Sequence, residues 1–156
     1  MSFTKTRISK ILIPLDNSES AMNAVDYALL ITKGLNAELA AIHVVRTEDA
    51  LVVTNQLIED LETVATRDSI LQKVKEDAQK WFSTIKQKGS FYGIRLKTGL
   101  VISSTEIEDA IVDFAERENV DLIVIGGGKS GLKERLLGSI TSRVATQTKR
   151  PILIVK

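Results

Sequence analysis

Residues 120–128 have the sequence VDLIVIGGG, a short apolar run followed directly by three glycines. Because apolar residues occupy both sets of alternating positions, the run predicts a strand buried on both faces, as in a parallel sheet. Similar runs lie at residues 11–15 (ILIPL) and 39–45 (LAAIHVV). A strand of mixed polarity is predicted within residues 93–102, and a last strand begins at Pro151, a first position where proline is tolerated.

Apolar residues at helical spacing separate the predicted strands. One helix is expected to end at Gly34 and the next at Gly89, because glycine commonly terminates helices. A third helix follows residues 103–106, whose sequence SSTE matches a capping box. A fourth helix is expected to start near Gly138. Residues 46–66 show no clear period, and their role stays open between a helical lead-in, a lid and a partner surface.

This alternation of strands and helices predicts an α/β fold in a single domain over residues 1–156. The expected architecture is a doubly wound, five-stranded parallel sheet with strand order 3-2-1-4-5 and helices on both faces.

The composition of the chain argues against several classes of partner and of chemistry. The 156 residues include 21 basic and 20 acidic side chains, so no strong field favours nucleic acid or an anionic membrane. The chain has no cysteine, which removes disulfides and thiolate chemistry. No apolar run approaches the ~18 residues of a membrane span, and the polar start does not resemble a secretory signal. A cytoplasmic location is therefore expected.

Polar and glycine-rich residues follow two of the predicted strands. Residues 16–18 (DNS) follow the first strand, and residues 126–131 (GGGKSG) follow the fourth. In an open α/β sheet, ligands bind at the carboxyl ends of the strands where the strand order reverses, which here is between these two strands. The glycine backbone and the helix start at residues 138–139 form a candidate phosphate site, although such a stretch is also compatible with an ordinary loop.

Two common phosphate motifs do not match. A P-loop ending at residues 128–130 would need glycine where Ile123 stands. Gly126, Gly128 and Gly131 have the spacing of a dinucleotide motif, but that motif belongs after a first strand.

The chain resembles the universal stress protein family over nearly its whole length. The matching segments are ILIPLDNSESAMNAVDYA at 11–28, AIHVV at 41–45, VDLIVIGGGKSGLKERLLGS at 120–139 and PILIVK at the end. The resemblance implies that Asp16 holds the adenosine part of a nucleotide and that the main chain of Val44 meets the adenine edge. It also implies a phosphate motif G-x2-G-x9-G-[ST], whose second half is Gly128 with Gly138 and Ser139.

The nucleotide-binding residues expected on this basis lie after the first, second and fourth strands. They are Pro14, Leu15, Asp16, Val44, Gly126, Gly128, Lys129, Gly138, Ser139 and Ile140. The motif departs from the family pattern at its first glycine, because Ile125 stands there and the nearest glycine is Gly126.

Simpler interpretations stay open for several of these residues. Asp16 could serve as a turn or helix-cap residue, Ser139 as a helix N-cap, and Lys129 as a solvated loop residue. The single histidine, His43, is expected to be a packed, hydrogen-bonded residue rather than a catalyst, and Trp81 is expected to be core.

The expected function is that of an adenine-nucleotide-binding stress-response protein that uses ATP or AMP, with or without Mg²⁺. The resemblance also implies a homodimer formed through the last strand, residues 151–156, whose apolar edge favours pairing. The alternative is a dimeric interaction module that has lost nucleotide. No catalytic residue or metal ligand is predicted, an unknown protein partner is compatible with either function, and slow ATP hydrolysis stays open.

Overall fold

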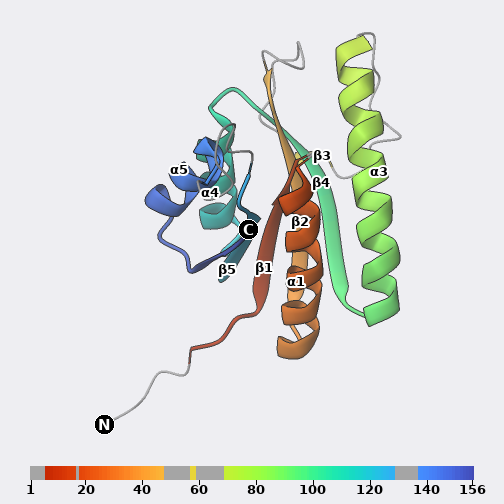
Figure 1. Cartoon of the computed structure of the whole chain (residues 1–156), viewed down its shortest axis with the longest axis vertical. Coiled ribbons are helices and arrows are strands. Elements are labelled where there is room, and N and C mark those ends of the chain that lie inside the picture. Colours follow the sequence, from red (N-terminus) through yellow and green to blue (C-terminus); the bar gives the residue numbers. More distant parts are fainter. Residues whose placement is uncertain (1–5, 17, 48–56, 59–68, 129–136) are drawn as a thin grey trace.

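Five parallel strands form the sheet in the computed structural model, which describes residues 6–16, 18–47, 57–58, 69–128 and 137–156. The strand order is β4-β2-β1-β5-β6, which confirms the order predicted from the sequence (Figure 1). The parallel strands are β1 (Lys10–Leu15), β2 (Glu38–Arg46), β4 (Arg95–Ser103), β5 (Leu122–Gly126) and β6 (Ile152–Val155).

A short antiparallel strand, β3 (Leu57–Ile58), adds to the outer edge of β4. The sequence did not predict this strand, because two residues are too few to show the alternation that marks a strand. It falls within residues 46–66, the segment without a clear period.

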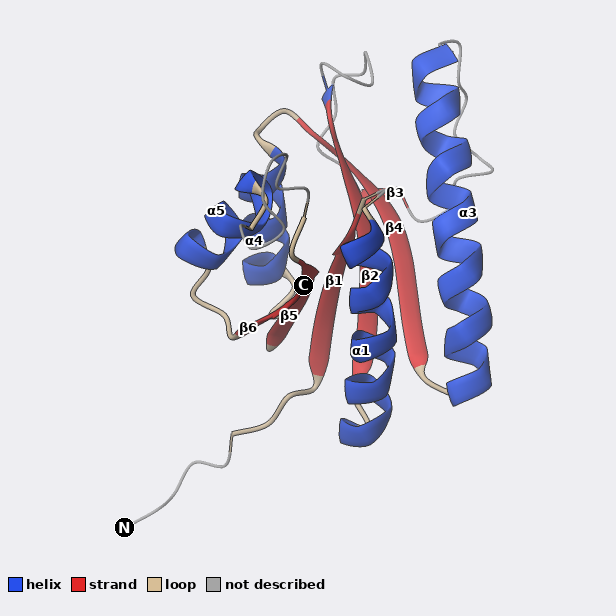
Figure 2. Ribbon diagram, in the orientation of Figure 1, coloured by secondary structure: helices blue, strands red, loops and turns tan. Residues whose placement is uncertain are grey.

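Helices cover both faces of the sheet, as predicted (Figure 2). α1 (Glu19–Leu35) and α3 (Ser69–Tyr92) lie on one face, and α4 (Ile107–Arg117) and α5 (Ser139–Gln147) lie on the other. None of these described helices is long and apolar enough to cross a bilayer.

The two-sided apolar strands are explained by these two layers. In β1, Ile11 and Ile13 belong to the core under α1 and α3, while Leu12 belongs to the core under α4 and α5. All three side chains are fully buried. Burial of each such side chain stabilises the fold by about 1.5–3 kcal/mol before the entropy cost of ordering it.

The helix ends differ from the sequence prediction. Gly34 and Gly89 lie inside α1 and α3, so the predicted ends at these glycines are wrong. α1 ends at Leu35 and is followed by its C-cap Asn36, which has a left-handed backbone (φ 52°), and α3 is followed by Gly93 (φ 66°). At each end two N–H groups donate to carbonyls of the last helical turn: those of Asn36 and Ala37 after α1, and those of Gly93 and Ile94 after α3. This pattern of hydrogen bonds requires a left-handed residue at the helix end.

The capping box predicted at residues 103–106 is also absent. Ser103 is the last residue of β4, and Glu106 is the N-cap of α4 without a side-chain hydrogen bond to the helix. Ser103 Oγ instead accepts the N–H of Thr105 at 3.1 Å. The hydroxyl therefore closes a local turn rather than the first turn of the helix.

Replacement of Thr32 by valine should stabilise the protein. Thr32 is buried in α1, and its hydroxyl has no hydrogen-bond partner among the described residues. Valine has nearly the same shape without the unpaired hydroxyl, so we expect the free energy of unfolding to rise by about 1 kcal/mol in urea titrations.

The matched control is Thr141→Val, because Thr141 is equally buried but its hydroxyl donates to the Gly126 carbonyl at 2.8 Å. This control should lose about 1–3 kcal/mol. A loss of stability in Thr32→Val as well would show that the Thr32 hydroxyl is satisfied.

Candidate functional site

A pocket of about 80 Å³ opens at the carboxyl ends of β1, β2 and β5. This is the edge of the sheet where the sequence predicted a ligand site. The pocket is lined by Pro14, Leu15, Asp16, Ser18, Ala21, His43, Val44, Ile107, Ile111, Ile125, Gly126, Ile140 and Thr141.

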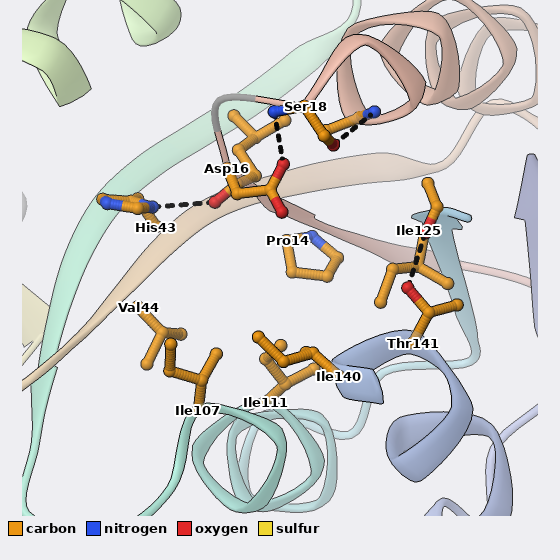
Figure 3. A pocket seen from close by; sticks show the side chains of 13 residues that line it. Pro14, Asp16, Ser18, His43, Val44, Ile107, Ile111, Ile125, Ile140 and Thr141 are labelled. Atoms are coloured by element: carbon orange, nitrogen blue, oxygen red, sulfur yellow. Dashed lines mark hydrogen bonds between the residues drawn. The ribbon is translucent and has the colours of Figure 1, made fainter. Parts of the chain in front are cut away.

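The walls of this pocket divide into an apolar side and a polar side. Figure 3 shows Val44, Ile107, Ile111 and Ile140 together on one side, with Asp16 and Ser18 across from them. The apolar side chains come from β2, α4 and the first turn of α5. Such a pocket suits a ligand with one apolar part and one part that donates hydrogen bonds.

The carboxylate of Asp16 is held in place by the turn that follows β1. Its Oδ1 accepts the N–H of Ser18 at 2.7 Å, and Ser18 Oγ accepts the N–H of Ala21 at 3.2 Å. Ser18, not Asp16, is thus the N-cap of α1. Within the described part of the chain only Ser18 donates to the Asp16 carboxylate, which is exposed and keeps acceptor capacity for a ligand hydroxyl.

His43 is hydrogen-bonded and packed, as the sequence predicted. Its Nδ1 lies 2.7 Å from the carbonyl oxygen of Leu15, and since a carbonyl can only accept, Nδ1 carries the hydrogen. The ring meets Trp81 of α3 edge to face, with 4.8 Å between ring centroids. Burial lowers the pKa of His43 below its ordinary value of 6.5, against the opposing effects of the Leu15 carbonyl, Asp16 and Asp77.

Stability should therefore fall as the pH drops below 6.5, because the unfolded chain binds a proton there before the folded protein does. The stabilisation from neutral His43 is complete above the unfolded pKa of 6.5 and is lost as the pH falls through the lower folded pKa. Urea titrations between pH 7.5 and 5 measure this slope, whose ceiling for one group is about 1.4 kcal/mol per pH unit.

His43→Asn supplies the control for this pH dependence, since the chain has no other histidine. Glu116, whose pKa its hydrogen bond to Arg150 lowers from 4.5, titrates below this pH window. An equal slope in the variant would contradict the assignment to His43.

The three glycines after β5 have different surroundings. Gly126 packs against α1, where an added Cβ would lie 2.5 Å from the backbone nitrogen of Ala21. Gly128 has φ +79°, and its N–H donates to Ser20 Oγ at 3.0 Å. Gly127 and Gly138 are joined by a 2.7 Å hydrogen bond from the Gly138 N–H to the Gly127 carbonyl.

Three of the residues expected to bind phosphate, Gly128, Gly138 and Ser139, are not part of the pocket lining. Gly138 is the N-cap of α5 and Ser139 is its first residue, so the interpretation of Ser139 as the N-cap is wrong. Lys129 lies outside the described residues. The described residues contain no group of three or more histidines, aspartates or glutamates that could hold a metal ion.

Six residues of the expected set line the pocket together: Pro14, Leu15, Asp16, Val44, Gly126 and Ile140. Ile107 and Ile111 were not predicted as pocket residues, and Ser18 was named only within the polar stretch 16–18 after the first strand. Ser18 could have been found as the N-cap before an apolar helix. Ile107 and Ile111 follow the apolar face of α4, so helical spacing assigns them to the core.

Comparison with known proteins defines the class to which this fold and pocket belong. The model of the universal stress protein family matches residues 7–156, and the chain belongs to this family. It is similar to the universal stress protein MJ0531 of Methanocaldococcus jannaschii, with 33% identity over 148 residues that cover 94% of this chain and 81% of the relative.

Solved structures show the same fold. The structure of protein MJ0577 matches with a TM-score of 0.75 and 31% identity, covering 97% of each chain. A universal stress protein in complex with cAMP matches with a TM-score of 0.70 and 23% identity, over 97% of this chain and 99% of the other. The universal stress protein of Archaeoglobus fulgidus in complex with dAMP matches with a TM-score of 0.64 and 21% identity, over 96% and 98%.

Proposed function

We propose that this chain is an adenine-nucleotide-binding stress-response protein that acts as a homodimer. The observation that carries the proposal is the two-sided pocket, in which the Asp16 carboxylate faces an apolar wall of Val44, Ile107, Ile111 and Ile140. The relatives whose structures contain cAMP and dAMP support an adenine nucleotide as the ligand.

In this proposal the adenine base packs against the apolar wall, and the main chain of Val44 meets its polar edge. The ribose lies toward Asp16, whose carboxylate accepts hydrogen bonds from sugar hydroxyls. The phosphates extend toward Gly128 and the start of α5 at Gly138 and Ser139, where helix N–H groups favour an anion. The ligand is ATP or AMP, and the triphosphate carries Mg²⁺ if the ion is required.

Calorimetric titration of nucleotide-stripped protein tests this function. Adenosine, AMP, cAMP and ATP are compared with and without Mg²⁺, and GTP serves as the control for the base. We expect micromolar binding of the adenine ligands and much weaker binding of GTP. Absence of binding by every adenine ligand would overturn the proposal and favour the ligand-free dimeric module.

The proposed dimer uses β6, which forms the edge of the described sheet next to β5. An apolar edge strand leaves backbone groups available for pairing with another chain. Leu153 of this strand is 36% exposed and points to the same face as Val124, its partner in the ladder. Antiparallel pairing of two β6 strands would bury this edge in a symmetric interface.

Leu153→Lys is expected to convert the dimer to a monomer in sedimentation experiments, because the pairing would bury an unpaired charge. Leu30→Lys is the matched control, since Leu30 is 63% exposed but lies on α1. A dimer that persists in the Leu153 variant would exclude β6 as the interface.

A further inference from the structure

We infer that His43 is a positioning residue for the nucleotide site, holding the Leu15–Asp16 peptide so that the Asp16 carboxylate stays over the pocket. The inference rests on the proposed function and assigns a role to a side chain that the proposed contacts leave unused. His43 lines the pocket, but its polar contact is with the protein main chain.

The backbone register places His43 of β2 opposite the last residue of β1. Leu15 ends β1 and lies opposite His43 in the ladder between β1 and β2. The imidazole Nδ1–H donates to the Leu15 carbonyl at 2.7 Å (Figure 3). The side chain thus adds a hydrogen bond between β1 and β2 at the point where their backbone pairing ends.

The hydrogen bond from His43 to the Leu15 carbonyl acts on Asp16 through the geometry of the peptide bond. The Leu15 carbonyl and the Asp16 N–H and Cα lie in one plane, so a hydrogen bond that orients the carbonyl also orients the start of residue 16. On the other side of Asp16, the Ser18 N–H holds Oδ1. His43 therefore restrains the backbone that leads into Asp16, and the Ser18 N–H restrains the Asp16 side chain.

The orientation of the imidazole is itself restrained by α3. Trp81 meets the ring edge to face at an interplanar angle of 82°, and this packing restrains the plane of the imidazole. Asp16 and Asp77 are the charged groups that act on the ring, and the buried surroundings favour its neutral form. Neutral His43 with hydrogen on Nδ1 is the species that makes the observed contact.

Two substitutions separate the hydrogen bond from the volume of the ring. His43→Leu removes the donor, and we expect the affinity for AMP to fall about tenfold, the size of one well-placed hydrogen bond. His43→Asn keeps an N–H donor near the position of Nδ1 and should recover most of this affinity. Loss of equal size in both variants would overturn the inference.

A double-mutant cycle with Asp16→Ala tests whether His43 acts through Asp16. We expect His43→Leu to lower AMP affinity much less in the Asp16→Ala background than in the wild type, because the side chain that it positions is absent there. Equal loss in the two backgrounds would overturn the positioning role while leaving the nucleotide site intact. Absence of AMP binding by the wild type would instead overturn the proposed function itself.

Discussion

Gly126→Ala should lower the free energy of unfolding by about 3 kcal/mol or more, the upper range for overpacking. The new Cβ would lie 2.5 Å from the nitrogen of Ala21 and 2.6 Å from the carbonyl carbon of Ser20. Both atoms belong to the backbone of α1, so no rotamer change can relieve the clash. Urea titration followed by circular dichroism measures the loss.

The neighbouring glycines provide an internal comparison for this experiment. At Gly127 the nearest atom to an added Cβ lies at 3.5 Å, an ordinary contact, so Gly127→Ala should change stability by less than about 0.5 kcal/mol. Gly128→Ala should lose about 1–2 kcal/mol, because its φ of +79° is unfavourable for alanine. Equal effects at Gly126 and Gly127 would show that α1 does not approach β5 as closely as described.

Asp16→Ala should weaken AMP binding about 100-fold, since the substitution removes a charged acceptor from the polar side of the pocket. Calorimetry at constant salt measures the affinity, and thermal unfolding shows whether loss of the turn to Ser18 also affects the fold. We expect Asp16→Asn to bind with intermediate affinity, because its oxygen can still accept a hydrogen bond without the charge.

Asp26→Ala is the matched control for charge. Asp26 lies on α1, is exposed and pairs with Lys88 at 2.8 Å, outside the pocket. Its removal should leave AMP affinity unchanged. Binding that survives Asp16→Ala at full strength would place the sugar away from Asp16 and refute the proposed orientation.

The sequence was sufficient to predict the parallel sheet because its strands are buried on both faces. Runs such as residues 11–15 show this burial without any knowledge of their neighbours. The helix ends were predicted less well, because Gly34 and Gly89 suggested stops that the backbone does not use. Glycine is not the only residue that adopts the left-handed conformation at a helix end, and Asn36, the C-cap of α1, adopts it here.

The polar side of the pocket was easier to predict than the apolar side. Asp16 stands out after an apolar strand, whereas Ile107 and Ile111 look like any core residues of a helix. The bond between His43 and Leu15 joins residues 28 positions apart and depends on the strand register. No local pattern in the sequence contains that information.

The packing of Trp81 against His43 gives the protein a natural optical probe. Trp81 is the only tryptophan in the chain, so the indole emission of the whole molecule comes from one ring beside the candidate site. Stopped-flow fluorescence can follow events at that ring on the millisecond scale without a label or an engineered chromophore. A kinetic description of ligand exchange is therefore accessible with the native chain.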